Sequence, residues 1–238
     1  MKLLKITKKK TAAPHRSYED ACGVAHALDL VGERWTLLVL RELMLGPKRF
    51  SDLRGSLPGI SANVLTQRLE GLELAGLLIR RKLPPPAAAQ VYELTPWGYE
   101  SEPIFQALGR WAARSPAHDP TLPVSAVSIM LSMRTMLDAK RAEGLDARIG
   151  FRMIDKRGGA ESFLGHLADG RIEIARANLD RADVVFTGTA RYLAAAIYGG
   201  LPLAALDKKG ALRIEGDRAL AERFVTLFPL PAKAEQTG

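Results

Sequence analysis

The chain has 238 residues, 47% of them hydrophobic and 25% charged, so it is long enough for one large domain or two ordinary ones. Its longest apolar runs fall short of the roughly 20 residues of a membrane-spanning helix, and its start lacks the apolar stretch of a secretory signal, so we expect a cytoplasmic protein with no membrane partner. The net charge is +8, and residues 1–82 carry seven of these charges, with 15 Lys and Arg against 8 Asp and Glu, which favours a polyanionic partner.

Cysteine and histidine are too few and too scattered to predict a disulfide or a zinc site. Cys22 is the single cysteine, and the histidines follow no metal-ligand spacing: they are His15, His26, His118 and His166. The sequence also lacks the G-x-S-x-G, H-E-x-x-H, Walker and dinucleotide-binding motifs. We therefore predict no metal, no cofactor and no catalytic residues, and we expect a protein that is not an enzyme.

A lysine-rich tail precedes the first predicted helices. Residues 1–17 lack a periodic apolar pattern and are expected to be disordered, with contact along DNA as the alternative. Apolar residues recur at helical spacing between residues 18 and 32, and the run 35–45 is apolar nearly all round, so both segments are predicted helices. A short helix over 50–57 precedes a Pro-Gly turn and Ser61, which can cap a fourth helix. The last two form a helix-turn-helix.

A predicted hairpin follows the helix-turn-helix. Residues 77–82 and 90–94 have the pattern of two strands, and the loop between them is rich in proline and alanine. A hairpin in this place is a wing. Thr95 and Pro96 then supply the cap and the first residue of one long amphipathic helix. We therefore predict a mainly α winged helix-turn-helix domain over residues 18–114.

Three prolines in residues 115–123 indicate a linker to a second domain. Residues 124–228 are predicted to form an α+β domain, in which a helix from Val124 to about Glu143 is followed by an antiparallel sheet with helices around it. Strands are expected at 147–154, 161–167, 171–175, 183–187 and 211–215, with helices at 190–198 and 218–227. Residues 229–238 remain as a tail.

The fourth helix carries the candidate base-reading residues. If its leucines face the core, the helical period turns Asn63, Thr66 and Gln67 outward, with Ser61 at the start and Arg68 at the flank. Asn and Gln can bond adenine edges, Arg can bond guanine, and Thr can bond bases or phosphates, although any exposed helix face is polar. Phosphate contacts are expected from the cations nearby, which are Lys48, Arg49, Arg54, Arg80, Arg81 and Lys82.

Residues 18–114 closely resemble the HxlR family, a branch of the MarR-like winged-helix regulators. The matching motifs are Cys22, Gly-x-Arg-Trp-Thr at 32–36, Gly-Pro-x-Arg-Phe at 46–50, Leu-Pro-Gly-Ile-Ser at 57–61 and Leu-x-Gln-Arg-Leu at 65–69. The resemblance implies a transcriptional repressor that is a homodimer, built mainly by the first helix and the long helix after the wing, on a roughly two-fold DNA operator. The wing departs from the family pattern, because Pro84, Pro85 and Pro86 make it stiffer and less charged.

Two features leave alternatives open. Trp111 and Phe105 fit a dimer contact or packing within one subunit equally well. Cys22 lies in the first turn of the first helix, where the helix dipole favours a thiolate but Glu19 and Asp20 oppose it. It is expected to be a quiet, partly buried thiol, with an oxidant sensor, as in several HxlR relatives, as the alternative.

Residues 124–228 resemble, more distantly, the sterol carrier protein type two domain, through Ala-Asp-Val-Val-Phe-Thr-Gly-Thr at 182–189 and Leu-Arg-Ile-Glu-Gly-Asp at 212–217. This resemblance implies a sheet covered by helices around an apolar tunnel for a lipid-like ligand. The methionines of the helix that begins at Val124 suit such a ligand, although a stripe of this kind is more often ordinary core.

The prediction for the whole chain is a sequence-specific DNA-binding transcriptional regulator that responds to a hydrophobic small-molecule effector in its C-terminal domain. One alternative is a lipid-binding protein that does not bind DNA. The other is a repressor that senses redox state through Cys22.

Overall fold

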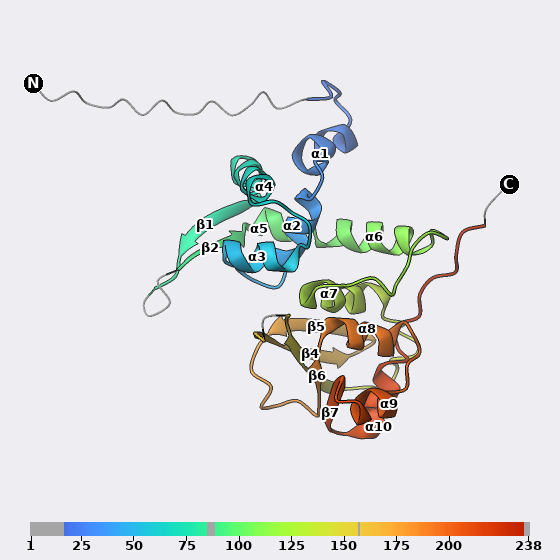
Figure 1. Cartoon of the computed structure of the whole chain (residues 1–238). Coiled ribbons are helices and arrows are strands. Elements are labelled where there is room, and N and C mark those ends of the chain that lie inside the picture. Colours follow the sequence, from blue (N-terminus) through green and yellow to red (C-terminus); the bar gives the residue numbers. More distant parts are fainter. Residues whose placement is uncertain (1–16, 85–88, 157, 236–238) are drawn as a thin grey trace, which may run out of the picture.

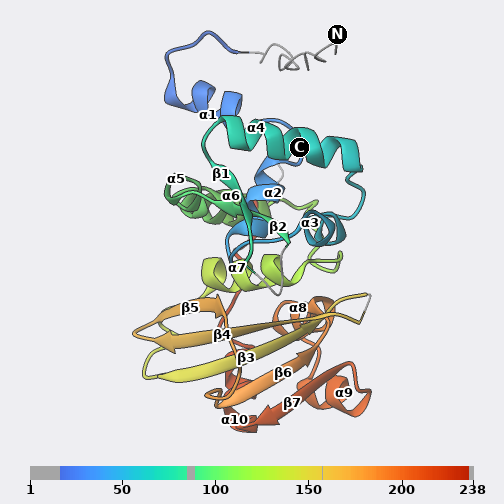
Figure 2. The same ribbon diagram turned by 90° about the vertical axis from the view of Figure 1, so that its left-hand side faces the viewer.

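The computed structural model of the chain describes residues 17–84, 89–156 and 158–235 (Figure 1). The predicted N-terminal tail, apart from Ser17, and the tip of the predicted wing lie outside the described residues. Within that part of the chain, a helical winged helix-turn-helix domain is followed by an α+β domain with a five-strand mixed sheet. Helix α7 (Ala126–Met136) lies between the N-terminal domain and this sheet in both views (Figures 1 and 2).

The N-terminal domain follows the predicted order of elements up to the end of the wing. Its helices are α1 (Gly23–Val31), α2 (Thr36–Leu43), α3 (Phe50–Ser56) and α4 (Ala62–Leu74). The wing consists of β1 (Leu78–Lys82) and β2 (Gln90–Leu94), which pair antiparallel from Leu78 opposite Leu94 to Lys82 opposite Gln90. Helices α1, α2 and α3 are shorter than the segments predicted at 18–32, 35–45 and 50–57, because the apolar pattern continues beyond the helix ends.

Local hydrogen bonds fix both ends of α4. The Ser61 hydroxyl accepts the Val64 N–H at 3.2 Å, which confirms the predicted cap. At the other end Gly76 adopts a left-handed φ of 73°, and the Leu77 N–H donates to the Leu72 carbonyl at 2.9 Å. This is a Schellman ending, in which glycine avoids the strain of a side chain at positive φ.

The single long helix predicted after the wing is wrong, because the chain breaks it into α5 (Pro96–Tyr99) and α6 (Glu102–Ala113). The Thr95 cap is confirmed, since its hydroxyl accepts the Gly98 N–H at 3.1 Å. Pro103 explains the break: it has no N–H to bond the carbonyl one turn earlier, and its ring excludes that carbonyl from a continuous helix.

The C-terminal domain has the strands that the sequence predicts in a different arrangement. Its further elements are β3 (Ala147–Ile154), β4 (Ala160–Ala168), β5 (Arg171–Arg176), β6 (Val184–Gly188), α8 (Ala190–Ile197), α9 (Leu203–Lys208), β7 (Leu212–Gly216) and α10 (Arg218–Phe224). The strand order is β5-β4-β3-β6-β7, and β3 pairs with β6 in parallel, so the predicted antiparallel sheet is corrected to a mixed one. The crossover from β5 to β6 returns the chain to the far side of β3, a pairing that no local pattern records.

Helix α7 ends seven residues before the predicted Glu143, and α9 was not predicted. The Asp138 side chain accepts the N–H groups of Lys140 and Arg141 at 2.9 and 3.2 Å, while its own N–H donates to the Leu227 carbonyl. This turn competes with the helix for the backbone groups, so α7 stops at Met136.

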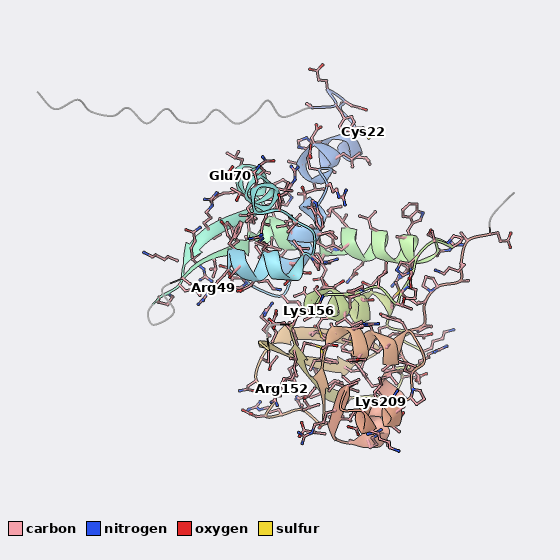
Figure 3. The ribbon with its side chains drawn as sticks, in the orientation of Figure 1. Cys22, Arg49, Glu70, Arg152, Lys156 and Lys209 are labelled. Carbon is pink, nitrogen blue, oxygen red and sulfur yellow. The ribbon has the colours of Figure 1, made fainter. Side chains whose placement is uncertain are left out.

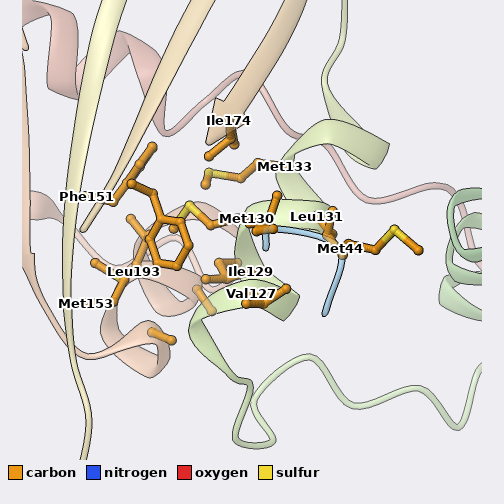
Figure 4. Packing of buried hydrophobic residues seen from close by; sticks show 14 of the residues in the cluster. Met44, Val127, Ile129, Met130, Leu131, Met133, Phe151, Met153, Ile174 and Leu193 are labelled. Atoms are coloured by element: carbon orange, nitrogen blue, oxygen red, sulfur yellow. The ribbon is translucent and has the colours of Figure 1, made fainter. Parts of the chain in front are cut away.

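Aromatic rings fill the interior of the C-terminal domain. Phe151 and Phe186 on neighbouring strands lie with ring centroids 6.0 Å apart, and each is 5.8 Å from Phe224 on α10. Phe228 packs edge-on against Phe224 at 5.0 Å. The methionine-bearing face of α7 is buried against this sheet (Figure 4), so that face is ordinary core.

The same buried apolar cluster continues into the N-terminal domain. Met44 follows α2, and Leu131 lies on the face of α7 turned towards it (Figure 4). Residues 115–123 form turns between α6 and α7, and these two helices pack against each other. Lys233, in the predicted C-terminal tail, donates to backbone carbonyls just after α6, including that of Ser115 at 2.9 Å. The two domains are therefore packed together rather than tethered.

Replacing Phe224 by alanine is expected to lower the free energy of unfolding by about 3–5 kcal/mol, because the cavity would open at the centre of the four rings. Urea unfolding followed by circular dichroism measures the change. Phe224→Leu serves as the control and should lose clearly less, since it keeps most of the apolar volume. Equal losses in both variants would contradict the ring packing as the source of stability.

Candidate nucleic-acid interface

The predicted base-reading face of α4 is open to solvent. Ser61, Asn63, Thr66 and Gln67 are exposed, whereas three leucines of the helix are buried: Leu65, Leu69 and Leu72. Thr66 also donates its hydroxyl to the Ala62 carbonyl at 3.0 Å, which holds its side chain against the helix. A helix with one buried apolar row and one exposed polar row can present the polar row to a groove.

Glu70 lies on the same face of α4, one turn beyond Gln67, and the sequence analysis did not single it out (Figure 3). Its carboxylate can accept a hydrogen bond from a cytosine amino group, and it repels phosphates. A carboxylate on this face is not expected from residue type alone, because it repels the DNA backbone. The spacing of seven from Asn63 was the available signal.

Arg68 is occupied inside the subunit and does not extend from the polar face. Its Nε donates to the Arg34 carbonyl at 3.1 Å, and its guanidinium pairs with Glu33 at 2.9 Å. These contacts tie α4 to the turn between α1 and α2. The predicted guanine contact from Arg68 would require it to leave these partners.

The expectation that Lys48 contacts phosphate is wrong, because its side chain is only 3% exposed. Its Nζ lies 3.1 Å from Glu42 Oε2 and donates to the Ser56 hydroxyl at 3.1 Å. A lysine next to an exposed arginine in sequence gives no sign of this burial. A signal did exist in Glu42, a carboxylate in an otherwise apolar helix, which needs a buried cation as its partner.

The remaining predicted cations are on the surface around α3 and the wing. Arg49 is exposed at the start of α3 and Arg54 in its last turn (Figure 3). Arg80 pairs with Glu73 at 2.8 Å, and Arg81 pairs with Glu93 at 2.7 Å. Because exposed ion pairs of this kind contribute little stability, these arginines can exchange a carboxylate for a phosphate. Lys82 is exposed as well.

The wing is attached to the segment that precedes α3. The backbones of Lys48 and Tyr92 form an isolated antiparallel bridge, with N–H to carbonyl distances of 3.1 and 2.9 Å. The guanidinium of Arg80 also lies over the Tyr92 ring at 5.7 Å. The orientation of the hairpin relative to α3 therefore depends on the position of Lys48.

Cys22 is fully exposed just before α1, so the expected partial burial is wrong (Figure 3). Hydrogen bonds from the backbone N–H groups of Ala25 and Val24 lower the pKa of its thiol. The first turn of a helix thus favours the thiolate here.

Helices α1 and α6 both leave apolar side chains uncovered on the N-terminal domain. No residue of α1 is buried, and its Val24 and Leu28 face solvent. On α6, Ile104, Leu108 and Trp111 share one face, and Trp111 is 74% exposed. Phe105 turns the other way and packs on the core, which separates the two aromatic residues that the sequence left undecided.

The described residues were also compared with the requirements of a metal site, a membrane span and a ligand pocket. In the described ranges no group of three or more His, Cys, Asp or Glu is arranged to hold a metal ion. The described helices include none that combines the length and apolarity needed to cross a bilayer. A pocket of about 310 Å³ opens at the edge of the C-terminal domain, where α8, α9 and the segment after α10 meet.

Comparison with known proteins divides the chain into two parts near residue 118, between α6 and α7. Residues 30–119 match the family model described as HxlR-like helix-turn-helix. The chain is 36% identical over 86 residues to the uncharacterized HTH-type transcriptional regulator YvaP of Bacillus subtilis, which covers 36% of this chain and 80% of that protein. The reduced form of the transcriptional regulator YodB from B. subtilis aligns with 34% identity and a TM-score of 0.37, over 41% of this chain and 98% of that one.

Residues 118–234 match the family model described as alkyl sulfatase C-terminal. The stereoselective inverting sec-alkylsulfatase Pisa1 from Pseudomonas sp. aligns with 46% of this chain and 16% of its own length, at 19% identity and a TM-score of 0.38. The matching model is not that of the sterol carrier protein type two domain, so that resemblance stays a prediction.

Proposed function

Because the chain belongs to the HxlR-like helix-turn-helix family of transcriptional regulators, we propose that it binds a specific double-stranded DNA operator as a homodimer and represses transcription. The observation that carries the proposal is the exposed polar row of α4 beside the wing. Helix α4 enters the major groove in this proposal, and Asn63 and Gln67 read base edges. Repression follows if the dimer covers a promoter, and binding to genomic DNA implies a cytoplasmic location.

The proposed phosphate contacts differ from those expected from the sequence. Arg49 precedes α3 and Arg54 lies in its last turn, and within the described residues neither side chain has a hydrogen-bond or ion-pair partner, so they are the first candidates. Arg80 and Arg81 contribute from the wing after exchanging their carboxylate partners. These contacts supply affinity and orientation, while the α4 side chains supply the choice of sequence.

We expect the full-length protein to bind the duplex upstream of its own gene more tightly than a scrambled duplex, in fluorescence anisotropy titrations across a salt series. Asn63→Ala and Gln67→Ala should each remove about 1–3 kcal/mol of discrimination between the two duplexes. Arg49→Ala should weaken binding to both duplexes and reduce the salt slope by about 1.

Two control variants are used, one at a cation far from α4 and one at a cation that is bound within the subunit. Lys209→Ala removes the same charge as Arg49→Ala at the opposite end of the structure and should leave the salt slope unchanged (Figure 3). Arg68→Ala should lower stability and affinity with no change in slope, because its contacts are within the subunit. No preference for any genomic duplex would overturn the regulator and favour a lipid-binding protein.

The homodimer is proposed from the uncovered faces of α1 and α6. A nine-residue helix with no buried residue is marginal in water without a partner surface. The exposed row of Ile104, Leu108 and Trp111 is the complementary apolar surface, and a second copy of the chain would bury both.

Light scattering of the purified protein should give twice the mass of one chain. Trp111→Glu and Leu28→Glu are each expected to shift the mass towards a monomer, because a carboxylate would be buried at the interface. Leu201→Glu, on an equally exposed leucine of the C-terminal domain, should remain dimeric. A dimer that survives both α1 and α6 changes would place the interface elsewhere.

Two signal inputs are proposed for this regulator, and a specific observation favours each. The pocket of about 310 Å³ has Ile197, Leu203 and Phe228 in its lining, and it suits the alkyl part of a hydrophobic effector. The C-terminal domain would then act as a binding module and not as an enzyme. The other input is oxidation of the exposed Cys22, whose lowered thiol pKa raises the thiolate fraction near neutral pH.

Operator binding in the presence of decyl sulfate or of the thiol oxidant diamide separates these inputs. Diamide should weaken binding by the parent protein but not by Cys22→Ser if the thiol is the sensor. Decyl sulfate should act equally on both proteins and lose its effect in Leu201→Trp, because Leu201 is an exposed residue of the pocket lining and the larger ring would occupy the pocket. An unchanged affinity in both arms would contradict both inputs.

A further inference from the structure

A cluster of polar and charged side chains lies between the two domains and takes no part in the proposed reading of bases. Three members belong to the N-terminal domain and three to the C-terminal domain. We call it the boundary cluster, and it consists of Glu42, Lys48, Ser56, Ser125, Glu161 and Arg176.

The centre of the boundary cluster is shut off from water. The side chains of Glu42 and Lys48 are 0% and 3% exposed. One carboxylate oxygen of Glu42 accepts from Lys48 Nζ at 3.1 Å, and the other accepts from the Ser125 hydroxyl at 2.6 Å. A serine of the C-terminal domain therefore completes the hydrogen bonding of a buried carboxylate in α2.

Lys48 lies between carboxylates of both domains. Its Nζ is 3.1 Å from Glu42 and 3.6 Å from Glu161 Oε1 on β4. Glu161 forms an ion pair with Arg176, in which Nη1 of the arginine lies 2.5 Å from Oε2 of the glutamate. The Nε of Arg176 donates to the Leu45 carbonyl of the N-terminal domain at 2.8 Å. A buried ammonium group depends on the negative charges around it. Loss of the Glu161 carboxylate would therefore leave Lys48 with Glu42 as its one ion-pair partner among the described residues.

Lys48 also connects to the elements that face DNA in the proposed function. Its backbone pairs with Tyr92 of the wing, and Arg49, the next residue, is the N-cap of α3. Its Nζ donates to Ser56 at the end of the same helix. A displacement of Lys48 would therefore move both the wing and α3.

We propose that Glu161 and Arg176 are positioning residues for DNA binding, an inference that rests on the proposed function. They hold Lys48 in place from the C-terminal domain, and the position of Lys48 sets the angle between the wing and α3. The C-terminal domain is then part of the DNA-reading unit rather than an appended module. Neither residue contacts DNA in this proposal, so the number of phosphate contacts does not depend on them.

The test uses full-length Glu161→Gln and Arg176→Met, with Glu173→Gln and Arg171→Met as matched controls. The controls make the same chemical changes at exposed positions of β5 in the same domain. Anisotropy titrations should show operator affinity about 5-fold or more below the parent for the two cluster variants, with an unchanged salt slope. Both controls should match the parent.

Hydrogen exchange without DNA gives a second readout, which simple loss of stability would not reproduce. The amides of Lys48 and Tyr92, which form the bridge to the wing, should exchange several-fold faster in the cluster variants. The amide of Leu69 in α4 should exchange at the parent rate. Uniformly faster exchange over the whole chain would overturn the positioning role and leave a general stabilising contact.

The two proposals fail in different ways. If the parent binds no duplex with preference, the regulatory function fails. If the parent binds and both folded cluster variants bind equally well, only the positioning role is overturned, whatever their exchange rates. Reduced affinity together with a smaller salt slope would also overturn it, since that result indicates a direct phosphate contact.

Discussion

Glu42 and Lys48 form an ion pair that is almost completely removed from water, and the rest of the structure is arranged around keeping that pair satisfied. Taking two charges out of water costs several kcal/mol per ion. Protein groups must therefore replace the hydrogen bonds that each ion made with water. Arg41 and Ser125 complete the carboxylate, while Ser56 and Glu161 surround the ammonium group. Two of these four partners come from the C-terminal domain.

This requirement explains why the domains are packed and not merely joined. The apolar cluster runs from α2 through α7 into the sheet, and the chain end returns to α6 through Lys233 (Figures 1 and 4). A winged helix-turn-helix by itself would leave Glu42 without the hydrogen bond from Ser125, although Arg41 and Lys48 would remain. The C-terminal domain therefore packs against the helix-turn-helix domain and supplies hydrogen bonds to its buried charges.

The same construction divides the N-terminal domain into fixed and available groups. Lys48 is buried with Glu42, and Arg68 is paired with Glu33 at the surface of the same subunit, so both cations are bound to groups of the protein itself. The amide and hydroxyl side chains of α4, together with Arg49, are left for an outside partner. Charge counted along a sequence treats these groups as equivalent, although burial gives them opposite roles.

The distinction also bears on how a signal could reach DNA. Cys22 lies at the exposed start of α1, on the side of the proposed dimer, whereas the pocket lies at the far edge of the C-terminal domain. A signal from the pocket must pass through packed side chains, and it can act only by favouring one arrangement of the domains over another.

By itself the sequence determined the elements that local patterns record. The helix-turn-helix, the Ser61 and Thr95 caps and the outward polar row of α4 follow from helical period and capping chemistry, which act within a few residues. The family of the N-terminal half was also readable, because its motifs are continuous in the chain. Only the tertiary structure decided the parallel pairing of β3 with β6, the early end of α7 and the roles of Lys48 and Arg68. Each depends on groups far away in the chain, such as Leu227 for α7 and Glu161 for Lys48, and contacts over such separations leave no periodic trace in the sequence.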